Sequence, residues 1–145
     1  MKRTITNQIK LIIPSLSQNE GFARSAVSSF ASQCDPTVQQ IGEIKTAVSE
    51  AVTNAIVHGY RGTTGDITIV MRLYSDSTLY ISIKDKGAGS ADIDQAMTPM
   101  FTTAPEEERS GLGFSVMESF TDKLRVKSEP HKGTTVIMEK RLSTP

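Results

Sequence analysis

Two side chains that can do chemistry, Glu50 and Asn54, lie four positions apart. Four residues make about one helical turn, so in a helix both side chains project from one face and can address one ligand. The amide oxygen of Asn54 suits Mg²⁺, which takes oxygen ligands and usually keeps waters and phosphate oxygens as the others. Glu50 could take a proton from a water or hydroxyl that attacks a terminal phosphate. The alternative is a solvated polar helix face.

A second candidate is Asp85, which closes a β-rich run and is followed by Gly87 and Gly89. The strand would hold the carboxylate firmly, while the glycines let the chain beyond it approach a flat ring closely. We therefore expect Asp85 to accept a hydrogen bond from an adenine amino group. An Asp-x-Gly turn after a strand explains the same residues without a ligand.

Another glycine pair, Gly111 and Gly113, stands where a loop becomes a helix. The start of a helix offers unpaired N–H groups to phosphate oxygens, and glycines let the phosphates come close. The Walker lysine motif is absent, so a P-loop protein is excluded. Arg109 could neutralise charge on a γ-phosphate as an arginine finger does. The alternatives are a flexible start to the helix and a solvated arginine beside Glu106–Glu108.

Thr134, which follows Gly133, is expected in a strand with its hydroxyl available to the adenine region. Each of these features is weak alone, but together they constrain one another. The four segments that would close around one nucleotide are Glu50–Asn54, Asp85–Gly89, Ser110–Phe114 and Gly133–Thr135. The combination predicts an ATP site.

Length and composition indicate one compact domain over residues 1–145, with 37% hydrophobic and 22% charged residues. Sixteen Lys plus Arg balance sixteen Asp plus Glu, so the overall charge favours neither direct nucleic-acid binding nor an anionic membrane. Cys34 is the one cysteine, which excludes an internal disulfide and a cysteine zinc site and favours the cytoplasm. No apolar run approaches the ~18 residues of a membrane span, so we expect neither a membrane protein nor an exported one.

Hydrophobic periodicity supplies the elements that must position these residues. The expected helices and strands are a strand over 5–13, a helix from a Ser17–Glu20 capping box to about Gln33, a helix from an Asp35-Pro36 cap to near Gly59, strands over 66–74 and 78–85, a short helix over 92–97, a long loop over 98–110, a helix over 112–120, and strands over 123–129 and 134–141. A two-layer α+β sandwich would bury one face of the strand pairs against the apolar stripe of each helix.

The four segments resemble the N, G1, G2 and G3 boxes of the GHKL (Bergerat-fold) ATPases. More closely, Glu43–Tyr60 and Arg109–Phe114 resemble the anti-sigma F factors of endospore-forming bacteria, a family of serine-protein kinases. The resemblance covers roughly Ile5 to Met138. It implies the GHKL type of α/β sandwich, with a mixed sheet covered by helices.

The resemblance also implies an activity and its partners. A homodimer would bind ATP and Mg²⁺, hold a sporulation sigma factor of the sigma F type inactive, and phosphorylate a serine of an anti-anti-sigma factor. Glu50 would be the catalytic base, Asn54 the Mg²⁺ ligand and Asp85 the adenine acceptor, with Arg109 at the γ-phosphate. Further nucleotide contacts would come from Gly87, Gly89, Thr102, Thr103, Ser110, Gly111, Leu112, Gly113, Phe114 and Thr134. Protein partners would dock on Glu20, Arg24 and Glu108; without the resemblance, Arg24 is a surface arginine.

The sequence departs from the family pattern in two places. Ser90-Ala91 follows the adenine loop where relatives commonly have an apolar residue and proline, and Ala104 stands where lysine is frequent.

Three other functions are alternatives to the sporulation kinase. A histidine-kinase catalytic domain would need a separate helix bearing a phosphoacceptor histidine, whereas His58 and His131 are the two histidines of the chain. A stoichiometric anti-sigma binder without kinase activity, or a general-stress anti-sigma kinase, would share the same boxes.

Overall fold

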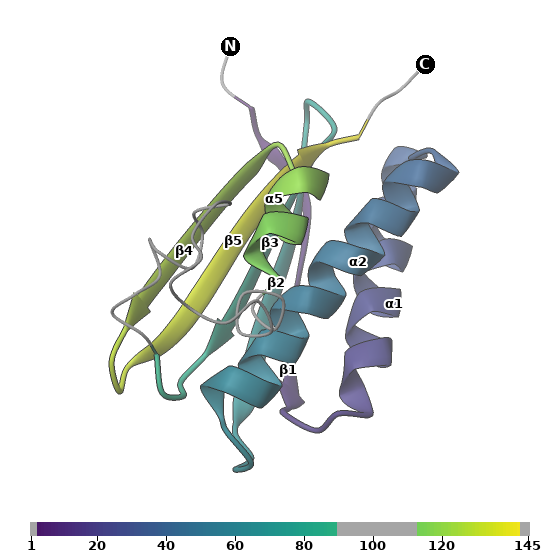
Figure 1. Cartoon of the computed structure of the whole chain (residues 1–145). Coiled ribbons are helices and arrows are strands. Elements are labelled where there is room, and N and C mark those ends of the chain that lie inside the picture. Colours follow the sequence, from purple (N-terminus) through teal and green to yellow (C-terminus); the bar gives the residue numbers. More distant parts are fainter. Residues whose placement is uncertain (1–2, 90–112, 143–145) are drawn as a thin grey trace.

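The computed structural model describes residues 3–89 and 113–142 of the protein. In these residues five strands form one sheet in the order β1-β2-β3-β5-β4, and helices cover one of its faces (Figure 1). The strands are β1 (Ile5–Pro14), β2 (Asp66–Tyr74), β3 (Thr78–Asp85), β4 (Lys123–Glu129) and β5 (Gly133–Arg141). The helices are α1 (Asn19–Ala31), a 3₁₀ turn (Ser32–Cys34), α2 (Val38–Asn54), a π-helical turn (Ala55–Gly59) and α5 (Phe114–Phe120). The expected two-layer α+β sandwich is confirmed.

The sheet is antiparallel at every strand pair of the described residues, so the expectation of a mixed sheet is wrong. β3 and β4 do run in the same direction, because each is antiparallel to β5. However, β5 lies between them and takes the hydrogen bonds of both, so no parallel pair forms.

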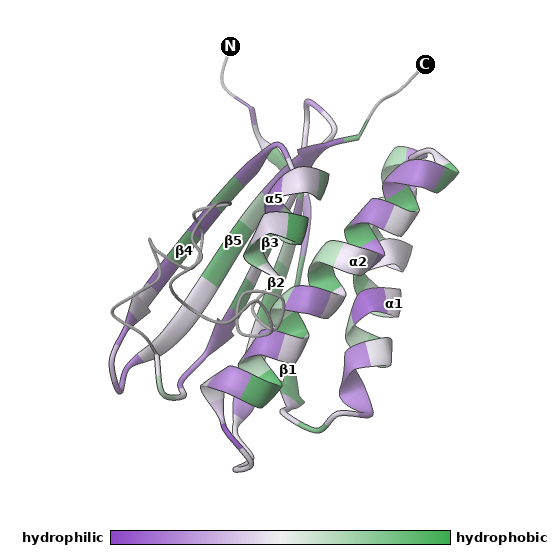
Figure 2. Cartoon of the chain, in the orientation of Figure 1, coloured by the Kyte–Doolittle hydropathy of each residue, from purple (hydrophilic) through white to green (hydrophobic). Residues whose placement is uncertain are grey.

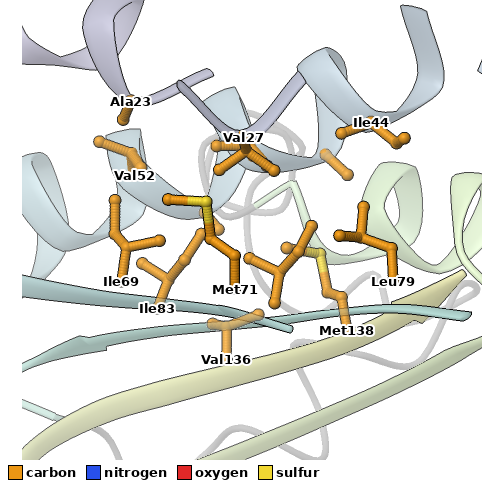
Figure 3. Close-up of a cluster of buried hydrophobic side chains, with 14 of the residues drawn as sticks. Ala23, Val27, Ile44, Val52, Ile69, Met71, Leu79, Ile83, Val136 and Met138 are labelled. Carbon is orange, nitrogen blue, oxygen red and sulfur yellow. The ribbon is translucent and has the colours of Figure 1, made fainter. Parts of the chain in front are cut away.

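The hydrophobic core lies between the helices and the sheet. α1 contributes Ala23 and Val27, and α2 contributes Ile44 and Val52, all fully or nearly fully buried. Figure 3 shows these side chains facing residues of the three central strands, namely Ile69, Met71, Leu79, Ile83, Val136 and Met138. Hydrophobic and hydrophilic segments alternate along α2, as Figure 2 shows. This amphipathic pattern presents one face of the helix to the core and leaves the other available for a polar site.

The edge strand β1 follows its predicted alternation only at one end. Ile13 is buried and Leu11 is half-buried, whereas Ile9 and Ile5 are exposed. A register shift between Ile5 and Asn7 places Ile5 opposite Tyr74. Because side chains alternate with period two, the extra residue moves Ile5 to the opposite face of the sheet from the other three.

Both expected helix caps are wrong. In α1 the Ser17 carbonyl, not its hydroxyl, accepts from the Glu20 N–H, so no capping box forms. In α2 the N-cap is Thr37, which forms a reciprocal capping box with Gln40. Asp35 cannot cap α2 because it adopts a left-handed conformation at the end of the preceding 3₁₀ turn.

The last turn of α5 is fastened to the rest of the fold through Lys140 of β5. The Lys140 ammonium donates to the Phe120 carbonyl at 2.9 Å and pairs with the Glu43 carboxylate at 2.9 Å. All three elements, α2, α5 and β5, therefore meet at one largely buried cation. Over residues 3–89 and 113–142, no helix has the length and apolarity needed to cross a membrane.

Candidate nucleotide-binding site

Glu50 of α2 and Gly113 at the start of α5 lie against each other. Gly113 has φ +64°, and a Cβ at this position would overlap Glu50 Oε2. Glu50 itself is half-buried. Because position 113 has no side chain, the carboxylate lies directly beside the backbone that leads into α5. The sequence predicts both residues in one site, and the structure brings them together.

Asn54 is the last residue of α2 and is buried, with 8% of its surface exposed. It lies one turn beyond Glu50, so the two side chains share a helix face. Immediately after Asn54 the chain widens into the π-helical turn Ala55–Gly59, closed by a bond from the Tyr60 N–H to the Ala55 carbonyl at 3.0 Å. Such single π turns are frequent at functional sites.

The Asp85 carboxylate is buried at the end of β3, with 4% of its residue exposed. Its Oδ1 accepts from the Gly87 N–H at 2.9 Å. Burial raises the pKa of this carboxyl, and the N–H groups of Gly87 and Thr134 offset part of that rise. A Cβ on Gly59 would lie 2.8 Å from the Asp85 Cγ, so the backbone after α2 packs directly on the carboxylate. A buried carboxylate held this way is suited to accept a hydrogen bond from a ligand amino group.

The loop after Asp85 is held from two sides. On one side the Ala88 N–H donates to the Gly59 carbonyl at 2.7 Å, and Gly87 lies so close to this carbonyl that a Cβ would overlap it. On the other side the Ala88 carbonyl accepts from the His131 N–H at 2.6 Å. Gly89, at φ +65°, lies against the Glu129 carbonyl, again with no room for a Cβ. The two predicted glycines are therefore required where the loop is clamped between the π turn and the β4–β5 turn.

Thr134 pairs in register with Asp85 across β5 and β3. Its hydroxyl is 2.8 Å from the Ser128 hydroxyl, and the preceding Gly133 packs on the Asp85 carbonyl. Phe114, by contrast, has its side chain in the hydrophobic core with 3% exposed. If Phe114 contacts a nucleotide, it therefore does so through its backbone.

Glu20 and Arg24, the predicted docking residues, are neighbours on α1. Arg24 Nε is 3.5 Å from Glu20 Oε2, and the arginine side chain is 47% exposed. The pair lies on α1, whereas Glu50 and Asn54 lie on α2. The remaining predicted site residues lie outside the described part of the chain: Thr102, Thr103, Glu108, Arg109, Ser110, Gly111 and Leu112.

Comparison with known proteins identifies the family of this chain. The family model of the histidine kinase-like ATPase domain matches residues 13–140. An anti-sigma F factor from Thermoanaerobacter sp. (strain X514) is 52% identical over 139 residues, covering 96% of each chain. One from Geobacillus sp. (strain WCH70) is 49% identical over 137 residues, covering 94% of each. This chain belongs to the anti-sigma F factor family.

The structural comparison agrees on the fold of this family member. A crystal structure of the RsbU and RsbW domains of a Mycobacterium tuberculosis protein superposes with a TM-score of 0.71 at 20% identity. The match covers 97% of this chain but 34% of that one, so this chain spans about a third of it. At this identity the likeness carries the fold alone.

The residues described fit the Mg²⁺ that an ATPase domain of this family implies. Asn54 offers an amide oxygen, and one turn earlier on the same helix Glu50 lies against the backbone of Gly113, which carries no side chain. In residues 3–89 and 113–142 no group of three or more His, Cys, Asp or Glu could hold a metal. Mg²⁺ usually keeps waters and phosphate oxygens among its ligands, so a site with few protein ligands is compatible with it.

The sequence alone assigns no role in the site to Gly59 or Tyr60. The sequence predicts Gly59 only as the end of a helix, whereas in the structure it contacts both Asp85 and Gly87. Tyr60 donates to the Asp66 carbonyl and accepts from the Lys86 N–H. Their position, directly after the helix that carries Glu50 and Asn54, is the signal that could have indicated them.

Proposed function

We propose that this protein is an ATP-dependent serine-protein kinase that also binds a sporulation sigma factor and holds it inactive. The single observation that carries the proposal is the contact between the Glu50 carboxylate and the Gly113 backbone. It joins an acid–base group on α2 to the glycine-rich segment that would hold the triphosphate. The names of the relatives, which are 46–52% identical, support the sigma-binding half.

Nucleotide recognition is assigned to the other end of the site. The buried Asp85 carboxylate accepts the 6-amino group of adenine, with the backbone of Gly87 and Gly89 beside the base and Thr134 as a further contact. Asn54 supplies an oxygen ligand to Mg²⁺, which when bound neutralises part of the triphosphate charge. Arg109 meets the γ-phosphate, and the remaining contacts come from Thr102, Thr103, Ser110, Gly111 and Leu112, and from the Phe114 backbone.

The transfer step uses Glu50 as general base. The hydroxyl of a serine on the anti-anti-sigma factor gives its proton to the Glu50 carboxylate as its oxygen attacks the γ-phosphorus. A bond forms between the serine oxygen and the γ-phosphorus, while the bond from that phosphorus to the β–γ bridging oxygen breaks. The products are phosphoserine and ADP.

Partner binding is assigned to α1. Arg24 and Glu20, with Glu108, form the docking surface for the sigma factor and for the anti-anti-sigma factor. The protein acts as a homodimer in the cytoplasm, where both partners would meet it.

The second candidate is a stoichiometric anti-sigma binder that uses nucleotide only as a structural ligand. Incubation with γ-labelled ATP and a purified anti-anti-sigma protein separates the two. Label on the partner's serine supports the kinase, whereas an unlabelled partner with retained sigma inhibition supports the binder. Co-purification from the native host then identifies the sigma factor and distinguishes a sporulation role from a general-stress one.

A further inference from the structure

The hydroxyl of Tyr60 joins three elements of the fold. It donates to the Asp66 carbonyl at 2.5 Å and accepts from the Lys86 N–H at 2.9 Å. Asp66 begins β2, and Lys86 follows directly after β3. One phenol oxygen therefore ties the end of the helical segment that carries the candidate site to the ends of two neighbouring strands.

Tyr60 is itself fixed at both ends. Its backbone N–H closes the π turn on the Ala55 carbonyl. Its ring packs on Gly65, where a Cβ would overlap Cε1. These contacts fix the position of the Tyr60 hydroxyl, and both of its hydrogen bonds depend on that position.

These contacts surround Asp85. The Tyr60 hydroxyl holds the amide of Lys86, and the adjacent Gly59 carbonyl holds the amide of Ala88. Between these two attachments the Asp85 Oδ1 accepts from Gly87, and the carboxylate packs on Gly59. The direction of the carboxylate is thus set by residues 59 and 60.

We propose that Tyr60 is a positioning residue that aims the Asp85 carboxylate and thereby sets the base selectivity of the nucleotide site. The inference rests on the proposed role of Asp85 as acceptor of the adenine amino group. It adds that selectivity for adenine depends on a hydroxyl that does not touch the base. Tyr60→Phe removes that hydroxyl and leaves the ring packing on Gly65, so the loop loses its attachment at Lys86 while the ring still fills its place.

The test compares ADP with purine riboside diphosphate, which carries hydrogen in place of the 6-amino group. By calorimetry, Tyr60→Phe should weaken ADP binding about three- to thirtyfold, the size typical of coupling between neighbouring groups. Binding of purine riboside diphosphate, which lacks the Asp85 contact, should change less than about twofold on the same reasoning. Hydrogen exchange at the Lys86 amide should become faster in the same variant. Tyr80→Phe, on the sheet face away from the helices, is the matched control and should change none of these.

A second variant perturbs the same anchor while keeping the hydroxyl. Gly65→Ala pushes against the Tyr60 ring and should reduce ADP selectivity in the same direction. Equal weakening of both nucleotides by Tyr60→Phe would show a merely structural role, and unchanged affinity for both would show that the hydroxyl does not act on the site. Either result leaves the selectivity unchanged and refutes the role of Tyr60 without refuting the adenine contact of Asp85. If the unaltered protein binds both nucleotides equally, the adenine contact of Asp85 fails, and the base-selectivity role of Tyr60 fails with it. Loss of discrimination in the variant alone supports both.

Discussion

The carboxylate of Glu50 touches the backbone of Gly113, across the interface between α2 and α5, with no space for a Cβ at position 113. The two residues are far apart in the sequence and come from different predicted boxes. Their contact makes the acid–base residue and the glycine segment a single unit, so changes on either side should be felt in the proposed reaction.

Glu50→Gln should lower phosphotransfer to the anti-anti-sigma serine by about 10²-fold or more, because a positioned general base typically contributes that much. Nucleotide affinity should stay within a few-fold, since the amide has the shape of the carboxylate. A single-turnover assay with labelled ATP measures the transfer. Glu118→Gln, an exposed glutamate on α5, is the control. Unchanged transfer in Glu50→Gln would refute the base assignment.

Gly113→Ala should destabilise the fold more than Gly62→Ala does. Both glycines have positive φ, +64° and +85°, so both alanines carry a backbone cost of about 1–2 kcal/mol. At Gly62 there is nothing within 4 Å of the added Cβ, whereas at Gly113 it overlaps the Glu50 carboxylate. Urea denaturation gives the free energy of unfolding of each variant. The difference between the two losses separates the steric overlap with Glu50 from the backbone strain that both variants share. Equal losses would contradict the contact described above.

Asp85→Asn should weaken ADP binding by about 1–3 kcal/mol, the cost of a buried hydrogen-bonding group left without its partner. The amide would place a donor against the adenine amino group, while its oxygen can still accept from the Gly87 N–H. Calorimetry measures the loss, and equal affinity in variant and parent would disprove the adenine contact.

The same substitution should change how stability depends on pH. Burial raises the pKa of Asp85 in the folded state above its usual 3.8, so the folded state binds this proton more tightly than the unfolded state does. The resulting stabilisation is complete below the unfolded pKa and is lost as pH rises through the raised folded pKa. Asp85→Asn removes that dependence. The difference between the two urea midpoints, followed across this pH range, should therefore shift in favour of the variant as pH rises.

Gly59→Ala should reduce nucleotide affinity, because its Cβ would lie 2.8 Å from the Asp85 carboxylate and push it from its place. Gly42→Ala is the control on the same helical segment, where the added Cβ meets nothing within 4 Å. That control should gain up to about 1 kcal/mol from the better helix propensity of alanine. Thermal denaturation and ADP titration of both variants make the comparison. Retained affinity in Gly59→Ala would show that the carboxylate can move without loss.

Arg24→Ala should leave ADP binding unchanged and weaken retention of the sigma factor. The arginine is half-exposed and pairs with Glu20 at 3.5 Å, a surface interaction that contributes little to stability. A pull-down with the purified sigma factor measures retention. Lys45→Ala, an exposed cation on α2, is the control. Equal retention in both variants would remove Arg24 from the docking surface.

Within residues 3–89 and 113–142, periodicity in the sequence was sufficient to place the five strands and three helices, although β1 keeps its alternation only at one end. It failed where a single backbone conformation decides the outcome. Asp35 appeared able to cap α2, but its left-handed φ commits it to the preceding turn, and Thr37 caps instead. Similarly, one bulged residue reverses the face of Ile5, which no two-residue period can reveal.

The sequence singles out Glu50, Asp85 and Gly113 as candidates, since their side chains or spacings have recognisable chemistry, and the structure brings Glu50 and Gly113 together. The supporting residues were not predicted. Gly59 and Tyr60 act through a carbonyl, a steric fit and a phenol, and their partners lie on β2, at the end of β3 and just after it. Such contacts depend on the packed fold, and the one sequence signal for these residues is their position directly after the helix that carries Glu50 and Asn54.

The bridge made by Lys140 has a mechanical consequence for α5. The helix is anchored at Phe120, its last residue, while Gly113, the residue just before its first turn, lies against Glu50. A force on the chain at Gly113 would therefore tilt α5 about its fixed C-terminal end. The largest displacement would occur at the end of α5 that faces Glu50, and almost none beside Glu43. Spin-label distances from each end of α5 to α2 would reveal this unequal swing.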